Sequence, residues 1–299
     1  MHTRIFGHRG APCARPENTL AGFAYALDAG VDGLELDVLM TRDGVPVVTH
    51  NPTLWKDTTR TADGAWLETD GPAIFDLTVQ ELQAYDVGGI RPGTDYAQKF
   101  PDQVTVPKAQ VPTLRAVLEL VKAHPRQIDL LVELKHMPDA ENQPEAEVFV
   151  ASVLAELRRA GLMETSYIHA FNWAILRASR QIAPELRRSY LSFERRDTRK
   201  GTLYSGSPWL AGLDVDRGPL PEVLHQDGAA AWSPHWSDVT AQHQALCDDL
   251  DLELLVWTVN EADQIRHWLD QGVSGLITDD PDLALALRHG EIAKDAVFS

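Results

Sequence analysis

The chain has 299 residues, which is long enough for one large domain with a sizeable core. Apolar residues make up 44% and charged residues 24%, so the sequence is not that of a disordered polymer. The formal net charge of −17 argues against electrostatic capture of nucleic acid or an anionic membrane, and an anionic substrate would need local cations or a metal.

Short β-rich runs alternate with amphipathic helical patterns along the chain. The expected strands are 4–8, 33–39, 129–135, 166–170, 187–192, 229–233, 254–258 and 275–278. The helical patterns include 19–29, 114–123, 145–160, 173–182, 239–250 and 261–271. This alternation implies parallel strands joined by right-handed crossovers. Eight such units predict an α/β fold, a closed TIM-type (β/α)₈ barrel, and no GxGxxG follows the first strand to favour a dinucleotide-binding sheet.

One interval breaks the alternation. Residues 51–110 are rich in Thr, Asp, Gly and Pro and show little helical period beyond 78–85. We therefore expect a single domain over 1–299 with a small subdomain inserted at 51–110, after the hairpin of the second strand. The insertion is expected to cover one side of the barrel mouth. Its stretch 91–108 carries Tyr96 and Phe100 and is expected to be an ordered loop.

A His-Arg pair follows the first expected strand. His8 and Arg9 lie between two glycines at the point where a barrel strand ends, and strand C-termini point into the active sites of such barrels. A histidine can carry a proton, and an arginine can bind a phosphate through two hydrogen bonds. Alone, the pair is equally compatible with a structural role.

Ionisable residues also occur two apart on otherwise apolar strands. Glu35 and Asp37 share one face of the second strand, and Glu133 and Lys135 share one face of the third. Carboxylates facing inward would repel one another unless a cation lies between them. Three carboxylates supply oxygen ligands for one hard divalent cation, Ca²⁺ or Mg²⁺, and Lys135 would add positive charge for a phosphate. A solvated hairpin edge and an internal salt bridge are the competing interpretations.

A hairpin is expected to bring a second histidine to the carboxylates. The Asp-Gly pair at 43–44 is a strong signal for a two-residue turn. With that turn, Arg42 pairs with Val45, and Asp37 then lies opposite His50. A register shift of one residue would change this pairing.

These residues together indicate one kind of chemistry. Two histidines suit general acid and general base catalysis near neutral pH. A divalent cation and two basic side chains suit the negative charge that develops on a phosphoryl group. The sequence contains neither a zinc-like Cys/His cluster nor a Gly-x-Ser-x-Gly nucleophile motif.

The motifs resemble those of the glycerophosphodiester phosphodiesterase family, within the superfamily of phospholipase C-like phosphodiesterases. The opening signature corresponds to His8-Arg9-Gly10 followed by Pro16-Glu17-Asn18-Thr19. Later landmarks in the same order are Glu35-x-Asp37, Thr41-Arg42-Asp43-Gly44, Val47-Val48-Thr49-His50, Val111-Pro112-Thr113-Leu114, Glu133-Leu134-Lys135, Phe171-Asn172, Trp257-Thr258-Val259-Asn260 and Thr278-Asp279. The resemblance spans residues 4 to about 288.

The resemblance implies metal-dependent hydrolysis of glycerophosphodiesters to an alcohol and glycerol 3-phosphate. It supports His8 and His50 as the catalytic pair, without telling which is acid and which is base. The chain departs from the family pattern at three places: Asn51 replaces an aspartate after His50, Asp57 replaces an arginine before two threonines, and Ala170 replaces a serine. These positions surround the site and bear on substrate preference rather than on the core chemistry.

Other residues have weaker claims to the site. Trp257 either stacks on the glycerol carbons or packs in the core. Glu17 either orients Arg9 or sits in the first turn of a helix, and Asn18 or Thr19 caps that helix.

Two alternative functions are distinguished by simple features. A phosphodiesterase of the lysophospholipase D type would use the same catalytic residues but need an apolar groove for an acyl chain. A non-catalytic metabolite-binding barrel would have lost a metal ligand or a histidine, and none is missing. The expected partner is a small-molecule glycerophosphodiester, and the oligomeric state is left open.

The sequence also suggests a compartment. Cys13 and Cys247 are expected to be reduced thiols. No stretch approaches the ~18 apolar residues of a membrane span, and no secretory leader precedes His8. These features predict a cytoplasmic protein.

Overall fold

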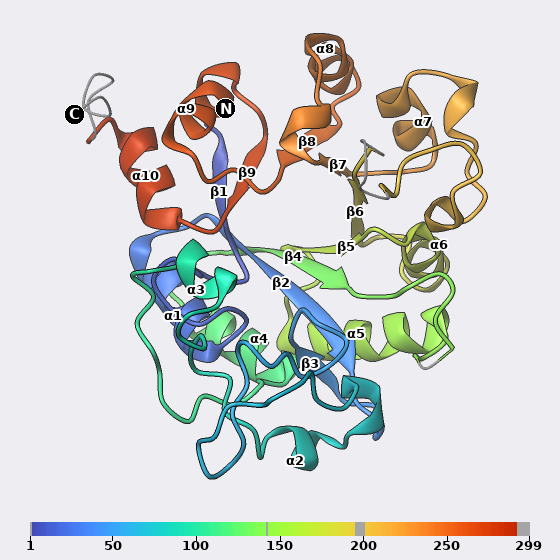
Figure 1. Ribbon diagram of the computed structural model, residues 1–299. Coiled ribbons are helices and arrows are strands. Elements are labelled where there is room, and N and C mark those ends of the chain that lie inside the picture. The colour runs from blue at the N-terminus through green and yellow to red at the C-terminus, as the bar shows by residue number, and fades with distance from the viewer. Residues whose placement is uncertain (1, 142, 195–200, 292–299) are drawn as a thin grey trace.

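A closed barrel of eight parallel strands forms the centre of the protein (Figure 1). The computed structural model describes residues 2–141, 143–194 and 201–291. The barrel strands are β1 (Arg4–His8), β2 (Gly33–Met40), β4 (Asp129–Leu134), β5 (Ser166–Ala170), β6 (Arg187–Ser192), β7 (Ala231–Pro234), β8 (Glu253–Val256) and β9 (Gly275–Thr278). The sheet closes because β1 pairs in parallel with both β2 and β9. The predicted TIM-type barrel is confirmed.

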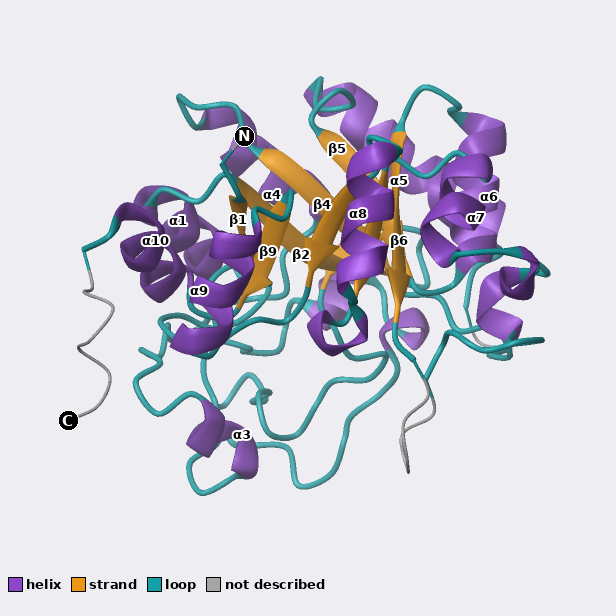
Figure 2. Ribbon diagram, turned by 90° about the horizontal axis from the view of Figure 1, so that it is seen from above, coloured by secondary structure: helices purple, strands orange, loops and turns teal. Residues whose placement is uncertain are grey.

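Helices surround the barrel (Figure 2). They are α1 (Leu20–Ala29), α4 (Leu114–Ala123), α5 (Ala146–Ala160), α6 (Trp173–Ile182), α7 (Leu220–Gln226), α8 (Ala241–Asp249), α9 (Ala262–Gln271) and α10 (Pro281–His289). Thr19 rather than Asn18 caps α1, since its hydroxyl accepts from the Gly22 amide at 3.0 Å. No helix in the described part of the chain is both long enough and apolar enough to cross a membrane.

The apolar core has two layers because side chains alternate along each strand. Leu130, Val132 and Leu134 of β4 face outward and join the large cluster between sheet and helices. Leu131 faces inward and packs with Phe6 and other side chains that fill the barrel interior. The polar residues that end the strands therefore lie above an apolar floor.

The hairpin after β2 differs from the predicted one. Strand β3 (Pro46–Val48) pairs antiparallel with β2, but Val38 lies opposite Val48, and the Thr49 amide donates to the Asp37 carbonyl. The predicted pairing of Asp37 with His50 is therefore wrong by one residue. The connection is a three-residue loop, closed by the Thr41 hydroxyl and by Gly44 at φ 77°, instead of a two-residue turn.

Residues 51–110 contain little regular structure. They hold a 3-10 turn (Ile74–Asp76) and two short helices, α2 (Val79–Leu82) and α3 (Asp95–Lys99). The stretch expected as a loop, 91–108, thus includes a helix. The segment has its own small apolar cluster, which includes Leu54, Ile74 and Leu82.

Candidate active site

The predicted site residues gather at the mouth of the barrel. His8 is the last residue of β1, Glu35 and Asp37 belong to β2, and Glu133 lies in β4 with Lys135 just beyond it. A cavity of about 120 Å³ brings together the following side chains: His8, Arg9, Glu35, His50, Glu133, Lys135 and Trp257. Despite the shifted register, His50 still faces the same cavity as His8.

Three carboxylates form a compact acidic cluster. Oxygens of Glu35, Asp37 and Glu133 lie within 4.8 Å of one another, the one such group in the described ranges 2–141, 143–194 and 201–291. All three side chains are buried, and Oε1 of Glu35 has no hydrogen-bond partner. A buried carboxylate oxygen without a partner and an all-oxygen donor set fit a hard divalent cation.

Two basic side chains are held by these carboxylates. The Lys135 ammonium lies 2.9 Å from Asp37 and 2.7 Å from Glu133. Arg9 Nε lies 3.2 Å from Asp37, and the Arg9 amide donates to Glu35 at 3.0 Å. Two positively charged side chains are thereby fixed beside the acidic cluster, which meets the need for local cations in an acidic protein.

The pKa values of the three carboxyl groups are shifted in different directions. Burial and the charges of Asp37 and Glu133 hold the pKa of Glu35 well above its usual range. Burial raises the pKa of Glu133 to about 7 against the opposing effect of Lys135. Burial also opposes ionisation of Asp37, but Lys135 and Arg9 outweigh it and hold the Asp37 pKa well below its usual range.

The raised pKa of Glu133 predicts a pH-dependent stability in protein stripped of metal. Because this carboxyl has a higher pKa in the folded than in the unfolded state, its contribution is present below about pH 4.5 and is lost as the pH rises through about 7. We expect the Tm of the chelated protein to fall between pH 5 and 8. Glu133→Gln should raise that Tm at pH 8.

Glu119→Gln, an exposed change on α4, is the control and should leave the Tm unchanged. Calorimetry at several pH values in excess chelator measures both variants. A chelated Glu133→Gln protein that melts below the wild type at pH 8 would contradict the assignment.

A tight turn after β1 positions Arg9. Arg9 adopts the left-handed conformation at φ 52°, followed by Gly10 at φ 91°. A Cβ at Gly7 would lie 2.3 Å from the Gly10 carbonyl oxygen, so the turn requires a glycine there. The turn directs the Arg9 amide toward Glu35 and the guanidinium toward Asp37.

His8 is fixed by a carboxylate from the opposite end of the chain. Its Nδ1 lies 2.5 Å from Oδ1 of Asp279, and its Nε2 lies 3.8 Å from Glu35. Asp279 also receives hydrogen bonds from Lys99 at 2.9 Å and from Asn260 at 2.7 Å. Burial opposes ionisation of Asp279, but the His8 ring and Lys99 outweigh it and lower its pKa. Asp279 therefore remains an anion beside His8.

His50 has a different environment. Its Nδ1 lies 2.7 Å from Oδ1 of Asn51, one of the positions where the chain departs from the family pattern. Burial, together with the charges of Lys135 and Arg9, lowers the pKa of His50 to about 3. The His50 ring is therefore neutral near pH 7. With Nδ1–H donating to Asn51, the lone pair of Nε2 is available.

Trp257 forms one wall of the cavity. Its indole donates to the Ser233 carbonyl at 2.9 Å, and its ring meets Phe171 edge-on with centroids 5.3 Å apart. The residue lies beyond the end of β8 and is half-buried, and it both lines the cavity and packs against the apolar cluster inside the barrel.

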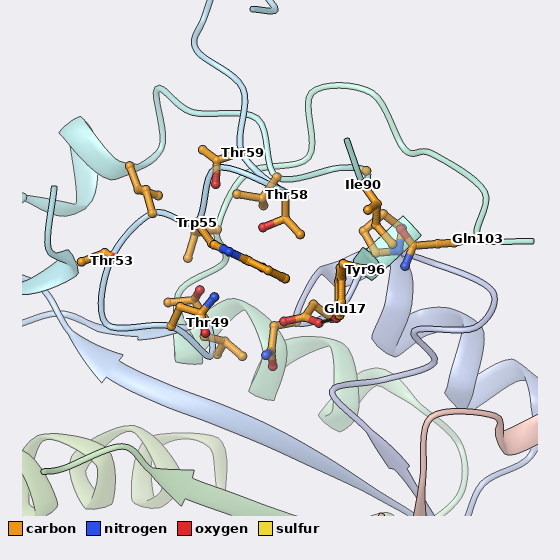
Figure 3. Close-up of a pocket in the computed structure, with 17 residues that line it drawn as sticks. Glu17, Thr49, Thr53, Trp55, Thr58, Thr59, Ile90, Tyr96 and Gln103 are labelled. Atoms are coloured by element: carbon orange, nitrogen blue, oxygen red, sulfur yellow. Dashed lines mark hydrogen bonds between the residues drawn. The ribbon is translucent and has the colours of Figure 1, made fainter. Parts of the chain in front are cut away.

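Glu17 contacts the basic residue Arg9, and Asn18 contacts the acidic residue Asp37. Glu17 lies 3.2 Å from the Arg9 guanidinium and accepts from the Tyr96 hydroxyl. The Asn18 amide donates to Asp37 at 2.8 Å. Both line a small pocket under the segment 51–110, in which Trp55 and Tyr96 face each other edge-on (Figure 3).

Three residues of the site were not expected as site residues. Asp279 appeared only as a family landmark, Lys99 lies on α3 within the segment 51–110, and His169 lies beside Glu133 in the β4–β5 register. His169 lines the cavity, and burial lowers its pKa to about 3. The sequence could have indicated His169, because it lies two residues from the inward-facing Tyr167 on β5 and so shares its face. No sequence pattern indicated that Lys99 contacts Asp279.

Comparisons with known proteins agree on one family. A model of the glycerophosphoryl diester phosphodiesterase family matches residues 8–283. A glycerophosphodiester phosphodiesterase of Caldanaerobacter subterraneus is 27% identical over 290 residues, covering 96% of this chain and 98% of the relative. A Silicibacter pomeroyi structure, provisionally named for the same activity, is 39% identical with a TM-score of 0.87, covering 97% of this chain and 94% of that one.

A more distant structure shares the fold. It is a phosphodiesterase from Oleispira antarctica, solved in complex with the product sn-glycerol-3-phosphate. It is 22% identical with a TM-score of 0.70, and the match covers 95% of this chain and 96% of that chain.

Proposed function

The chain belongs to the glycerophosphoryl diester phosphodiesterase family, and we propose that it hydrolyses glycerophosphodiesters to glycerol 3-phosphate and an alcohol with two histidines and a divalent cation. The observation that carries this proposal is the convergence of two histidines, two carboxylates and two basic side chains on one cavity of about 120 Å³, namely His8, His50, Glu35, Glu133, Arg9 and Lys135. Asp37 completes the acidic cluster beside that cavity. A chain that only bound metabolites would have no need for two histidines that face one cavity beside an acidic cluster.

The glycerol end of the substrate is assigned to the wall beside Trp257. The ring of Trp257 and the edge of Phe171 offer apolar surface to the glycerol carbons. Arg9 and Lys135 line the same cavity, and a phosphate is attracted to their charges. This orientation leaves the leaving alcohol toward the wider opening of about 460 Å³ between Arg9, His50 and Trp55.

The two histidines divide the proton transfers. His50 is neutral with a free Nε2, and we assign it the base that takes a proton from the nucleophile, either water or the neighbouring hydroxyl of the glycerol. His8 lies between Asp279 and Glu35, and we assign it the acid that protonates the leaving alcohol. Asp279 holds the His8 ring in place.

Charge on the phosphoryl oxygens is stabilised by Arg9 and Lys135, whose positions are fixed by Asp37. Glu35, Asp37 and Glu133 would hold the cation, which supplies Lewis-acid stabilisation of that charge when bound. Ca²⁺ and Mg²⁺ both suit these oxygen ligands. We place the enzyme in the cytoplasm because both cysteines, Cys13 and Cys247, are free thiols.

Asp279→Asn should lower kcat while preserving the fold. Without the carboxylate, the His8 ring loses the group that orients it, and a misplacement of about 1 Å can cost ~10²-fold in rate. The pH profile of kcat should also change, because the variant removes the negative charge that lies beside the His8 ring. Asp282→Asn removes a neighbouring carboxylate that bonds Tyr25 outside the cavity, and serves as the control.

Steady-state kinetics across pH 5–9 distinguish positioning from general destabilisation. A reduced kcat with an unchanged pH profile would contradict the role given to Asp279.

The proposed function is tested directly by product analysis. Purified protein with added Mg²⁺ or Ca²⁺ is incubated with glycerophosphocholine, glycerophosphoethanolamine and glycerophosphoglycerol, and glycerol 3-phosphate is measured enzymatically. We expect glycerol 3-phosphate from at least one of the three. Release of glycerol and a phosphorylated alcohol instead would overturn the proposal.

A further inference from the structure

The short helix α3 joins the segment 51–110 to two carboxylates at the barrel mouth. Tyr96 and Lys99 lie three residues apart on this helix, so their side chains leave it on neighbouring positions of one face. The Tyr96 hydroxyl donates to Glu17, and the Lys99 ammonium donates to Asp279 at 2.9 Å. One face of a five-residue helix therefore bonds two carboxylates that come from opposite ends of the chain.

Each of these carboxylates also holds a residue of the catalytic cavity. Glu17 lies 3.2 Å from the Arg9 guanidinium, to which the phosphate is assigned. Asp279 lies 2.5 Å from Nδ1 of His8, to which the acid is assigned. Each carboxylate is thus shared between α3 and a side chain that faces the substrate cavity.

The Asp279 carboxylate has a defined orientation because its two oxygens have different partners. Oδ1 faces His8, whereas Oδ2 accepts from Asn260 at 2.7 Å and from Lys99 at 2.9 Å. Without Lys99, Oδ2 keeps only the Asn260 amide among the side-chain partners that the structure describes. The carboxylate then rotates more freely, and the ring of His8 loses part of its support.

Lys99 is placed to act through Asp279 rather than on the substrate. It is not among the described residues that line the catalytic cavity or the wider opening beside His50. Its own side chain is 53% exposed, whereas the side chain of Asp279 is only 2% exposed. The Lys99 ammonium therefore reaches in from the surface and ends on a buried carboxylate.

Other contacts hold α3 in place independently of these two bonds. Phe100 follows the helix and is buried, and its ring meets the Tyr96 ring edge-on with centroids 5.1 Å apart. The Tyr96 ring also meets Trp55 edge-on (Figure 3). The Gln103 side chain donates to the Pro12 carbonyl at 2.8 Å. Removal of one hydroxyl or one ammonium group should therefore leave the helix where it is.

We propose that α3 carries two positioning residues for the hydrolysis, Lys99 and Tyr96, each acting through the carboxylate that it bonds. Lys99 acts on the His8 ring, and Tyr96 acts on the Arg9 guanidinium. The inference rests on the proposed function, in which these two groups protonate the leaving alcohol and bind the phosphate. The segment 51–110 thereby takes part in the reaction from outside the cavity.

The role of Lys99 predicts an effect that depends on the leaving group. Lys99→Met removes the charge and keeps the length of the side chain. We expect kcat for glycerophosphocholine to fall about tenfold, because a small misplacement of a reacting group costs up to ~10²-fold. A p-nitrophenyl ester of glycerol phosphate needs no proton from His8, so its kcat should fall by less than about twofold. Lys99→Arg restores the charge and should recover most of the lost kcat.

The role of Tyr96 predicts an effect that does not depend on the leaving group. Tyr96→Phe removes only the hydroxyl that bonds Glu17. Arg9 would bind the phosphate, which both substrates share. We therefore expect kcat/KM to fall by about fivefold for glycerophosphocholine and by the same factor for the p-nitrophenyl ester.

Double variants test whether each residue acts through its carboxylate. In the Asp279→Asn background, Lys99→Met should lower kcat for glycerophosphocholine by less than about twofold, because the carboxylate that Lys99 orients is already gone. In the Glu17→Gln background, Tyr96→Phe should likewise have less than about half of its effect on kcat/KM.

Matched controls come from the same segment. Lys56→Met removes an exposed lysine, and Tyr85→Phe removes a hydroxyl from a ring that packs on the small apolar cluster of the segment. Both should retain wild-type kinetics with both substrates. Calorimetry of every variant shows whether the fold is kept.

The outcomes separate this inference from the function on which it rests. Equal kinetics for Lys99→Met and Lys56→Met overturn the inference alone. So does a loss in Lys99→Met that is the same for both substrates, or one that multiplies fully with that of Asp279→Asn. A loss in Tyr96→Phe that is confined to glycerophosphocholine also overturns it. Absence of hydrolysis of both substrates by the wild-type protein overturns the proposed function instead.

Discussion

Replacing His8 or His50 with alanine is expected to lower kcat for glycerophosphocholine by about 10²–10⁴, because each change removes a positioned proton carrier. Neither ring packs in the apolar core, and both lie at the cavity, so the Tm should change little. His267→Ala, at an exposed position of α9, is the matched control and should retain full activity. Near wild-type turnover by either site variant would exclude the two-histidine mechanism.

The division of labour between the histidines has its own test. A p-nitrophenyl ester of glycerol phosphate releases a good leaving group that needs no protonation. His8→Ala, which lacks the proposed acid, should therefore be rescued on this substrate, whereas His50→Ala should not. Equal rescue of both variants would remove the assignment of acid and base. Rescue of His50→Ala alone would reverse it.

Glu35→Gln and Glu133→Gln are expected to abolish tight binding of the divalent cation and to lower activity by at least ~10³. A bound cation would contribute several kcal/mol of charge stabilisation, and each variant removes an anionic ligand from the proposed set of three. Calorimetric titration with Mg²⁺ and Ca²⁺ measures binding independently of turnover. The exposed Glu119→Gln variant controls for the loss of one negative charge.

A stoichiometric, tight titration of Glu35→Gln would contradict the assigned ligand set. Tight binding with lost activity would show that Glu35 acts in another way, for instance through its contact with the Arg9 amide.

The barrel and the acidic cluster were predictable from local patterns. Side chains alternate on a strand, so Glu35 and Asp37 had to share a face, and Glu133 had to face inward while Leu134 faced outward. Parallel strands end at the same side of a barrel, which placed these carboxylates near His8. The structure brings them together because the strand registers align Asp37 with Glu133.

The hairpin shows the limit of such patterns. The pair at 43–44 correctly indicated a turn, but it did not decide between a two-residue and a three-residue loop. Hydrogen bonds of the Thr41 hydroxyl to Asp43 and Val45 favour the longer loop. His50 reaches the cavity anyway, because it follows β3 rather than pairing within it.

The contacts that complete the site are long-range and have no local signal. Asp279 lies 271 residues from His8 in sequence, and Lys99 lies 180 residues from Asp279. Neither pairing follows from residue spacing, because each depends on barrel closure and on where the segment 51–110 folds.

The most direct test of the central claim is glycerol 3-phosphate release from glycerophosphocholine by protein stripped of metal and then titrated with Mg²⁺ or Ca²⁺. We predict negligible release in chelator, recovery on addition of one equivalent of a divalent cation, and no recovery for His50→Ala. Full release by the exhaustively chelated wild-type protein would contradict the account.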